Sequence, residues 1–465
     1  MPFSRAMQDT KTYCAVMSES RALWKKHLRH VFMAAPYRHP VLVSGKDAWV
    51  HDTSGKRYLD LSSGQFSCPF GHGDRRLAKI VAGQLQSLGH TNDLLVHETV
   101  FRATSDLASI APKGLGKAIL LSTGTEANEC AFRIAKAYTG KNGIVGFDRG
   151  YYGLSVATQS ISAGGRYADP KVPNMFCIPV ADPLSVPAGM TLAEHESDCV
   201  ARARRRLARA KGRIGLFIFE PILSAGGMIF PSPGYVAKLL PLIREHRALL
   251  AFDEAQTGLG RIGRWFGCGR YRCAPDMLTV SKGLGCGLPV SAVLLNTRIS
   301  KKIEGQYLHF SSHQNDPVGA AVVSYAIGRI RKEKLLARVR STGAYFLRAL
   351  RALERSDAWL ANVRGEGLML AFELEQDVFA SQKSYNLGFM LQDLLEQSGV
   401  LVQAVARGRI FRLLPPYIIA KKDIDFFVDA LADCLRCLKE DAGLRKKLAA
   451  RNRASIRAPF FSMFH

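Results

Sequence analysis

Three short apolar runs along the chain each end in polar residues of a different kind. They cover residues 214–219 before Glu220, 248–252 before Asp253, and 277–280 before Ser281 and Lys282. Short, unbroken runs rich in Ile, Leu, Phe and Val are typical of strands buried on both faces of a parallel sheet. Ligands of open α/β sheets bind beyond the carboxyl ends of the strands. The pattern therefore predicts a site at one sheet edge, built from two acids and a lysine.

The rest of the chain alternates between predicted strands and helices. From about 75 to 325 this alternation predicts a parallel sheet of βαβ units. The other expected elements are a helix over 18–36, a small β-meander over 41–61 with its turn at 52–55, irregular loops over 160–187, an amphipathic helix over 320–337, strands near 368–374 and 400–414, and a final helix near 423–438.

These elements predict an α/β fold with unequal parts. We expect an N-terminal segment over 1–74, a large, mostly parallel-sheet α/β domain over 75–325, and a smaller α+β domain over 326–465. The small domain is expected to combine the C-terminal part with the N-terminal segment.

A candidate phosphate site lies where a predicted strand at 118–122 meets a predicted helix at 126–138. The turn between them is Thr123, Gly124 and Thr125. Such a turn offers hydroxyls, unpaired N–H groups and the positive end of the helix dipole to an anion. The alternative is an N-capped helix without a ligand. The turn matches neither nucleotide-binding glycine pattern, so a nucleotide is not favoured.

Lys282 and Asp253 carry the strongest chemical signal. Apolar and glycine residues flank Lys282, and desolvation there would lower its pKa and make a neutral amine available. Asp253 ends an apolar strand and needs a cationic partner. Pyridoxal phosphate (PLP) offers an aldehyde to the lysine, a pyridine nitrogen to the aspartate and a phosphate to the turn. A plain Asp–Lys ion pair is the alternative, and it leaves the turn unexplained.

Composition and charge change this picture little. The net charge is +25, so a nucleic-acid-binding pseudoenzyme is a remote alternative. The basic runs at 202–213 and 445–457, however, fit solvated helix faces, and we expect no nucleic-acid partner. No stretch of about 20 apolar residues predicts a membrane span, and the N-terminus has no signal-peptide core. We therefore expect a cytoplasmic protein.

Cysteine spacing does not predict a metal site. The 10 cysteines are scattered, and the single C-x-x-C, Cys434 and Cys437, lies in a predicted helix without a second pair or a nearby histidine. A structural zinc site normally needs four ligands. We predict no bound metal.

Several motifs together resemble the class III PLP-dependent aminotransferases, which have fold type I and are usually homodimers. They occur in the expected order over most of the chain. These motifs are LSTGTEANE (121–129), FEPILSAGG (219–227), FDEAQTGLGRIG (252–263), SKGLGCGLP (281–289), SSHQNDP (311–317) and FRLLPP (411–416).

The resemblance implies a role for each matching residue. Lys282 would hold the PLP aldehyde and move protons, and Asp253 would pair with the pyridine nitrogen. The other implied cofactor contacts are Thr123, Gly124 and Thr125 at the phosphate, Tyr151 on the ring face, Gln256 at the phenolic oxygen, Ser312 at the phosphate across a dimer interface, and Glu220. Arg412 would bind the substrate carboxylate.

Within the family, the likeness is nearest to 2,2-dialkylglycine decarboxylase. It rests on LSSGQ (61–65), GKNGIVGF (140–147), EPILS (220–224) and residues 313–317. Gln65 would contact the carboxylate that leaves; the alternative is a strand-end amide bonded to backbone. Tyr151, Leu154 and Ala225 depart from that enzyme's pocket. Ser312 and Asp316 match part of its alkali-metal site, but Asp93 does not.

The expected function is therefore amino transfer from an amino acid to a 2-oxo acid such as pyruvate, with decarboxylation of the donor as a finer hypothesis. A class III aminotransferase that acts on an ω-amine or amino acid without decarboxylation is the alternative. The expected assembly is a homodimer or a dimer of dimers.

Overall fold

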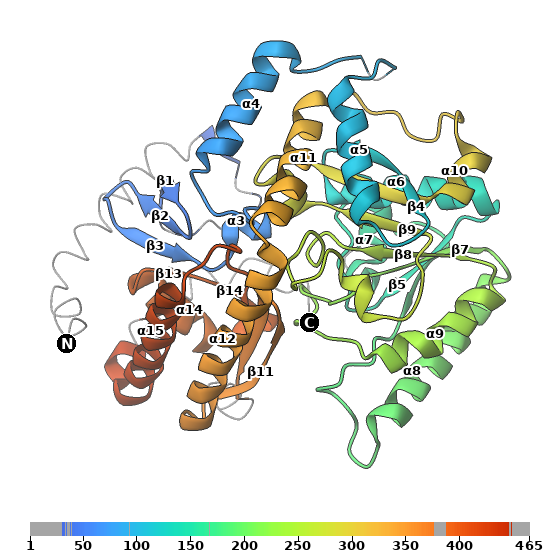
Figure 1. Cartoon of the computed structure of the whole chain (residues 1–465). Helices are drawn as coiled ribbons and strands as arrows, with labels where there is room; N and C mark the ends of the chain where they lie inside the picture. The colour runs from blue at the N-terminus through green and yellow to red at the C-terminus, as the bar shows by residue number, and fades with distance from the viewer. Residues whose placement is uncertain are drawn as a thin grey trace.

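The computed structural model describes residues 30–32, 34, 38, 40–92, 94–166, 168–375, 387–445 and 448. The helix expected over 18–36 falls almost entirely outside these residues, as does most of the basic run at 445–457. Among the described helices, none has the length and apolar character needed to span a membrane. Figure 1 shows a large sheet flanked by helices beside a smaller group of sheets and helices.

The large sheet has seven strands in the order β4-β10-β9-β8-β7-β5-β6. Strands β9, β8, β7, β5 and β6 run parallel, whereas β10 is antiparallel to both β9 and β4. Their bounds are β4 Leu115–Leu121, β5 Gly143–Phe147, β6 Met175–Ile178, β7 Ile214–Phe219, β8 Leu249–Asp253, β9 Met277–Val280 and β10 Ser291–Asn296.

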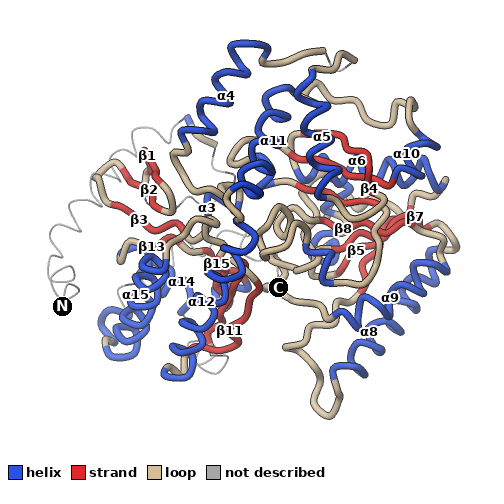
Figure 2. The backbone as a smooth tube through the Cα atoms, viewed as in Figure 1, coloured by secondary structure: helices blue, strands red, loops and turns tan. Residues whose placement is uncertain are grey.

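Both faces of this sheet are buried, as the apolar runs predict. Phe217 and Phe219 of β7 join one hydrophobic cluster, and Leu216 and Ile218 join another. Successive side chains of a strand point to opposite faces, so the two clusters lie on opposite sides of the sheet. Figure 2 shows helices around the strands. The helices of the large part are α4 Arg75–Leu88, α5 Glu98–Ile110, α6 Gly124–Thr139, α7 Val156–Gln159, α8 Leu192–Leu207, α9 Pro233–Glu245, α10 Thr297–Ile303 and α11 Pro317–Lys332.

Two expected elements are wrong. The segment 160–187 is not wholly irregular, because residues 175–178 form the edge strand β6 against β5. Four residues between Pro- and Gly-rich stretches are too short for a periodic signal. The helix expected over 320–337 ends at Lys332, because Lys334 adopts a left-handed conformation with φ 51°. A new helix, α12 (Leu335–Ser356), then begins.

The smaller part joins the two ends of the described chain. Strand β13 (Val400–Leu401) pairs in parallel with β3 (Arg57–Asp60), so the predicted N-terminal meander and the C-terminal part share one sheet. The order of that sheet is β1-β2-β3-β13, and the neighbouring sheet has the order β11-β12-β15-β14. The remaining elements are β1 Leu42–Lys46, β2 Trp49–Asp52, α3 Ser63–Phe66, β11 Leu360–Glu366, β12 Met369–Leu374, α14 Leu387–Gln397, β14 Gln403–Val405, β15 Ile410–Leu413 and α15 Lys421–Glu440.

The structure confirms the predicted fold class. The meander, the three buried strands, the helix after the Thr-Gly-Thr turn and the final helix all lie where the pattern places them. The domain boundaries at 74/75 and 325/326 stay a prediction.

Candidate active site

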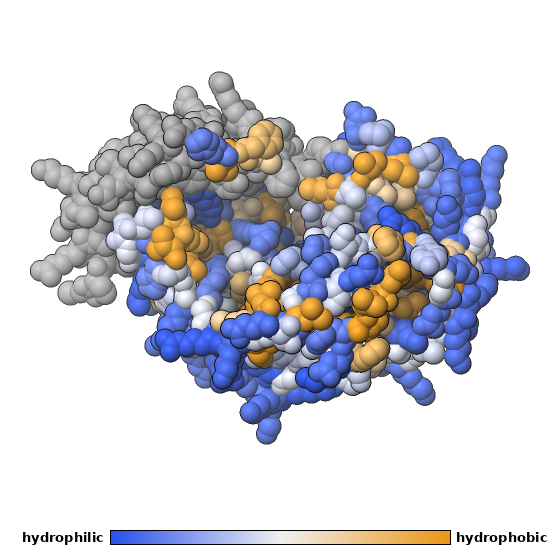
Figure 3. All heavy atoms as spheres, turned by 90° about the horizontal axis from the view of Figure 1, so that it is seen from above, coloured by the Kyte–Doolittle hydropathy of each residue, from blue (hydrophilic) through white to orange (hydrophobic). Residues whose placement is uncertain are grey.

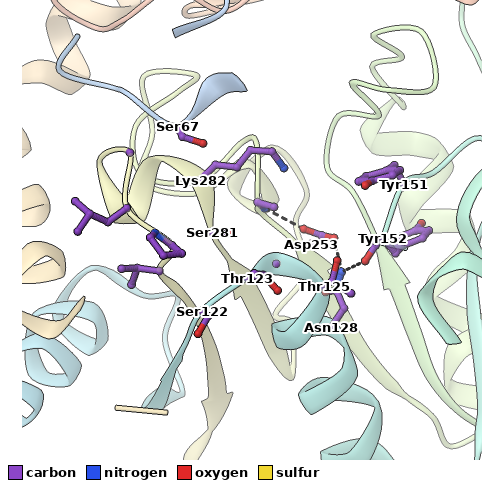
Figure 4. Close-up of a pocket in the computed structure, with 17 residues that line it drawn as sticks. Ser67, Ser122, Thr123, Thr125, Asn128, Tyr151, Tyr152, Asp253, Ser281 and Lys282 are labelled. Carbon is purple, nitrogen blue, oxygen red and sulfur yellow. Dashed lines mark hydrogen bonds between the residues drawn. The ribbon is translucent and has the colours of Figure 1, made fainter. Parts of the chain in front are cut away.

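A cavity of about 400 Å³ lies at the carboxyl ends of β8 and β9, beside the beginning of α6. Figure 4 shows side chains from these separate segments meeting there. The cavity is lined by Ser67, Ser122, Thr123, Gly124, Thr125, Asn128, Tyr151, Tyr152, Gly153, Asp253, Ala255, Ser281, Lys282, Gly287, Leu288, Pro289 and Val290. The structure thus brings together six of the residues that the sequence singles out.

One end of the cavity is formed by the N-terminus of α6. Thr123 is the N-cap, and its hydroxyl accepts a hydrogen bond from the Glu126 amide at 3.2 Å. An added Cβ at Gly124 would lie 3.3 Å from Cβ of Ser281, so glycine keeps this entrance open. The amides at the very start of α6 and the helix dipole suit a phosphate here.

Asp253 is fixed by hydrogen bonds on both carboxylate oxygens. Asn128 donates through Nδ2 to Oδ2 at 2.8 Å, and the Ala255 amide donates to Oδ1 at 3.0 Å. Asn128 is held in turn by Thr279, whose hydroxyl donates to its Oδ1 at 2.7 Å (Figure 4 shows the bond to Asp253). Burial nevertheless raises the pKa of Asp253. A cation beside this carboxylate would favour its charged form.

Asn128 is a residue that sequence reasoning missed. It lies in α6 between the buried residues Ala127 and Ala131, and it is itself buried. A polar side chain on the apolar face of a helix, one turn beyond the phosphate turn, is the signal that could have found it.

Lys282 follows β9 and Ser281 and extends into the same cavity (Figure 4). Its backbone is left-handed with φ 47°, a conformation that costs free energy in a non-glycine residue and is common at active sites. Burial lowers the pKa of Lys282, while the negative charges of Asp253 and Glu220 oppose that shift. Lys282 and Asp253, both in the described part of the chain, form no ion pair with each other, so the simple Asp–Lys alternative is wrong.

Glu220 is buried and does not line the cavity. Its Oε1 accepts a hydrogen bond from the Tyr151 amide at 2.7 Å. Burial, and then the charge of Asp253, raise the pKa of Glu220 to about 8. Tyr152 is buried, with its hydroxyl bonded to the Phe147 amide at 2.9 Å. Tyr151 is therefore the aromatic side chain of this pair left to face a ligand.

These groups fit PLP. The turn before α6 suits its phosphate, Lys282 supplies an amine, and Asp253 is a buried carboxylate in need of a positive partner. Gln256 has a buried Oε1 without a hydrogen-bond partner among the described residues. An orphaned buried amide atom indicates a place for a ligand.

The aminotransferase class-III family matches residues 32–435 of the chain. The chain belongs to this family. Its members use PLP, so the group that fits the cavity is also the cofactor of this class III aminotransferase. The finer likeness to 2,2-dialkylglycine decarboxylase stays a prediction.

Individual relatives and solved structures agree with this assignment. The acetylornithine aminotransferase of Methanosarcina acetivorans is 31% identical over 395 residues, which are 85% of this chain and 91% of the relative. The mitochondrial alanine–glyoxylate aminotransferase 2 of Homo sapiens is 28% identical over 443 residues, with 88% and 85% covered. A thermostable ω-transaminase structure from Thermomicrobium roseum aligns with TM-score 0.82 at 27% identity, covering 90% of this chain and 98% of that one.

In this aminotransferase, Arg412 is buried beside the cavity but outside its lining. Its Nη2 donates to Gln403 Oε1 at 2.6 Å, and its Nη1 donates to Ser224 Oγ at 3.2 Å. Its Nε is buried without a hydrogen-bond partner among the described residues. Burial lowers the pKa of Arg412 to about 10, and the charge of Glu220 opposes that shift.

Gln65 is exposed and also lies outside the cavity lining, in the short segment α3. Gly64, Gln65 and Phe66 all have positive φ there, and the Asp60 carboxylate accepts a hydrogen bond from the Gly64 amide at 2.7 Å. Gln65 Oε1 accepts a hydrogen bond from Gln403 Nε2. This bond is to a side chain, so the backbone-bonded alternative is wrong. Gln403 thus connects Gln65 with Arg412.

Ser312 is exposed and does not line the cavity of its own chain. Its contact with the phosphate across a dimer interface stays a prediction.

Proposed function

We propose that this enzyme transfers the amino group of an amino acid to a 2-oxo acid, without decarboxylation, and that Arg412 binds the carboxylate of both substrates. The observation that carries the proposal is the buried, preorganised guanidinium of Arg412. Its positive charge contributes to the lowered pKa of Lys282, so the two side chains lie within electrostatic range. Two relatives support the proposal. The acetylornithine aminotransferase is named for an amino acid derivative, and alanine–glyoxylate aminotransferase 2 is named for an amino acid and a 2-oxo acid.

Arg412, Lys282 and Asp253 would each have a separate role in the reaction. Arg412 would orient the carboxylate by paired hydrogen bonds, which places the α-carbon near Lys282. Lys282, whose pKa is lowered, would take the proton from that carbon and pass it to the cofactor rather than back to the same carbon. Asp253, held by Asn128, would stabilise positive charge at the cofactor ring. When bound, PLP supplies an electron-accepting ring for the charge that develops at the α-carbon.

Decarboxylation of the donor is the second candidate. One observation favours it: Gln403 links Gln65 to Arg412, so the side-chain amide of Gln65 lies near the carboxylate-binding group. A carboxylate held by Gln65 perpendicular to the ring plane would be the group that leaves.

One pair of assays separates the two candidates. The PLP-loaded enzyme is given alanine with glyoxylate, and separately 2-aminoisobutyrate with pyruvate. Non-decarboxylating transfer predicts glycine and pyruvate from the first mixture and no CO2 from the second. Acetone, CO2 and alanine from the second mixture would establish decarboxylation instead. If the first mixture gives no product, a panel of 2-oxo acid acceptors is tested with [15N]glutamate as the donor. The absence of a labelled amino acid product with every acceptor would contradict the proposal.

We further propose that the enzyme is a homodimer whose partner completes the phosphate site with Ser312. Large apolar side chains are exposed between α4 and α5 and before Ser312: Leu94, Leu95 and Val96, then Tyr307 and Phe310. Figure 3 shows hydrophobic patches on the face seen from above Figure 1. Exposed apolar surface of this kind often marks an interface.

A mixed dimer tests this arrangement. Lys282→Ala and Ser312→Ala subunits are mixed, and PLP affinity is measured at the site that keeps Lys282. If Ser312 acts across the interface, that site receives an intact Ser312 and binds PLP like the unaltered enzyme. If it acts within its own subunit, the site stays weakened. A monomer in sedimentation equilibrium would refute the proposal.

A further inference from the structure

A second group of chemically active side chains lies outside the cavity. It consists of His90, which follows α4, and of His313 and Asp316, which precede α11. Their ligand atoms lie within 4.8 Å of one another, and this is the metal-competent group found among the described residues. His90 and His313 are 223 positions apart in the sequence, so only the folded chain brings them together.

Both imidazoles converge on one carboxylate. His90 Nδ1 lies 2.5 Å from Asp316 Oδ1, and His313 Nδ1 lies 2.6 Å from Asp316 Oδ2. The two rings lie 5.0 Å apart between centroids, at 47°. Asp316 is the N-cap of α11, yet its side chain makes no capping hydrogen bond. An N-cap aspartate normally accepts hydrogen bonds from the helix amides. The Asp316 carboxylate is instead hydrogen-bonded to the two histidines.

The three side chains have the composition of a transition-metal site. Two imidazole nitrogens and one carboxylate oxygen suit Zn²⁺ and its neighbours in the first transition row better than Na⁺, K⁺ or Mg²⁺. Three protein ligands leave a fourth tetrahedral position for water. The negative charge of Asp316 offsets the positive end of the α11 dipole, which would otherwise disfavour a cation. We propose that His90, His313 and Asp316 bind a divalent transition-metal ion, with Zn²⁺ as the best match.

An ion at this place would be bound to a loop that contacts both β4 and α6. Asn315 is joined to β4 by two hydrogen bonds with Leu120, at 3.0 and 2.9 Å. His309, at the other end of the same loop, lies 3.2 Å from Glu126 in the first turn of α6. The loop is thus attached to the wall of the cofactor cavity. A metal would tie this loop, with Ser312, to the segment that follows α4.

Direct metal binding tests the proposal without any assay of turnover. Untagged, PLP-loaded enzyme is stripped with a chelator, dialysed and titrated calorimetrically with ZnCl2. We expect one Zn²⁺ per chain, and in the His90→Gln and His313→Gln variants an affinity lower by at least about tenfold. His51→Gln serves as a matched histidine control, and Cys68→Ser controls for binding by a thiol. Both controls are expected to bind like the unaltered enzyme.

A second measurement covers variants that fold poorly. Co²⁺ added to the unaltered enzyme should give the visible absorption of a tetrahedral nitrogen–oxygen site, without a thiolate charge-transfer band. Equal Zn²⁺ affinity in the unaltered enzyme and in both histidine variants would overturn the proposal, and so would a cobalt spectrum dominated by thiolate. Because no substrate is used, failure here leaves the proposed aminotransferase activity untouched.

Discussion

Asn128 holds the carboxylate of Asp253 in place through a hydrogen bond of 2.8 Å from its Nδ2 to Oδ2. The same amide group donates to the Tyr152 carbonyl at 2.7 Å. One buried side chain thus joins α6, the segment after β5 and the end of β8. The acid that would face the cofactor ring is thus oriented by hydrogen bonds within the protein.

Replacing Asn128 with Ala should therefore weaken PLP binding. Loss of a hydrogen bond to a charged group costs about 1.5–3 kcal/mol, so we expect the dissociation constant of PLP to rise by about 10–100-fold. Absorbance titration of the cofactor-free enzyme measures it. Thr279→Val, which removes only the bond that holds Asn128, should have a smaller effect. Unchanged PLP affinity in Asn128→Ala would contradict the role assigned to this residue.

Lys282→Ala should abolish turnover, because no other lysine in the described part of the chain lines the cavity. Proton transfer by a positioned side chain contributes about 10²–10⁴-fold, and loss of the amine that anchors the cofactor adds to this. Initial rates with saturating PLP provide the measurement. Borohydride treatment followed by peptide mapping should label position 282 in the unaltered enzyme and not in the variant. Full activity in Lys282→Ala would rule out the proposed chemistry.

Gln403 is expected to act on substrate affinity through Arg412. In Gln403→Leu, the guanidinium loses its bond of 2.6 Å, and we expect KM for the amino acid donor to rise about tenfold with a smaller change in kcat. An amine without a carboxylate provides an internal control, since its KM should not change. Arg412→Lys, which cannot form paired hydrogen bonds, should raise KM further. If Gln403→Leu raised KM equally for the amino acid donor and for the amine without a carboxylate, the role of Gln403 would be merely structural.

Glu220 should make the stability of the cofactor-free enzyme depend on pH. Its pKa rises from 4.5 to about 8 on folding, so between these values the folded chain holds a proton that the unfolded chain has released. Stability therefore falls as pH rises from about 4.5 to about 8, with a slope of up to about 1.4 kcal/mol per pH unit. Glu220→Gln keeps an acceptor for the Tyr151 amide but cannot titrate, and its melting temperature should fall less across this range. Identical profiles would show that Glu220 is ionised throughout.

The sequence by itself determined the layers of the fold and the centre of the site. The apolar runs before Glu220, Asp253 and Lys282 encode β7, β8 and β9, because burial on both faces demands continuous apolar residues. Parallel strands deliver their following residues to one edge. These are local properties of composition and spacing, so they could be read without coordinates.

The tertiary structure alone decided the contacts between distant segments. Nothing near Gln403 in the sequence indicates that it joins Gln65 to Arg412, because strand pairing in the small part sets that contact. The meeting of His90 with His313 depends in the same way on how the segment after α4 lies against the beginning of α11. Side-chain partners across such separations follow from packing of whole elements, and no local pattern carries that information.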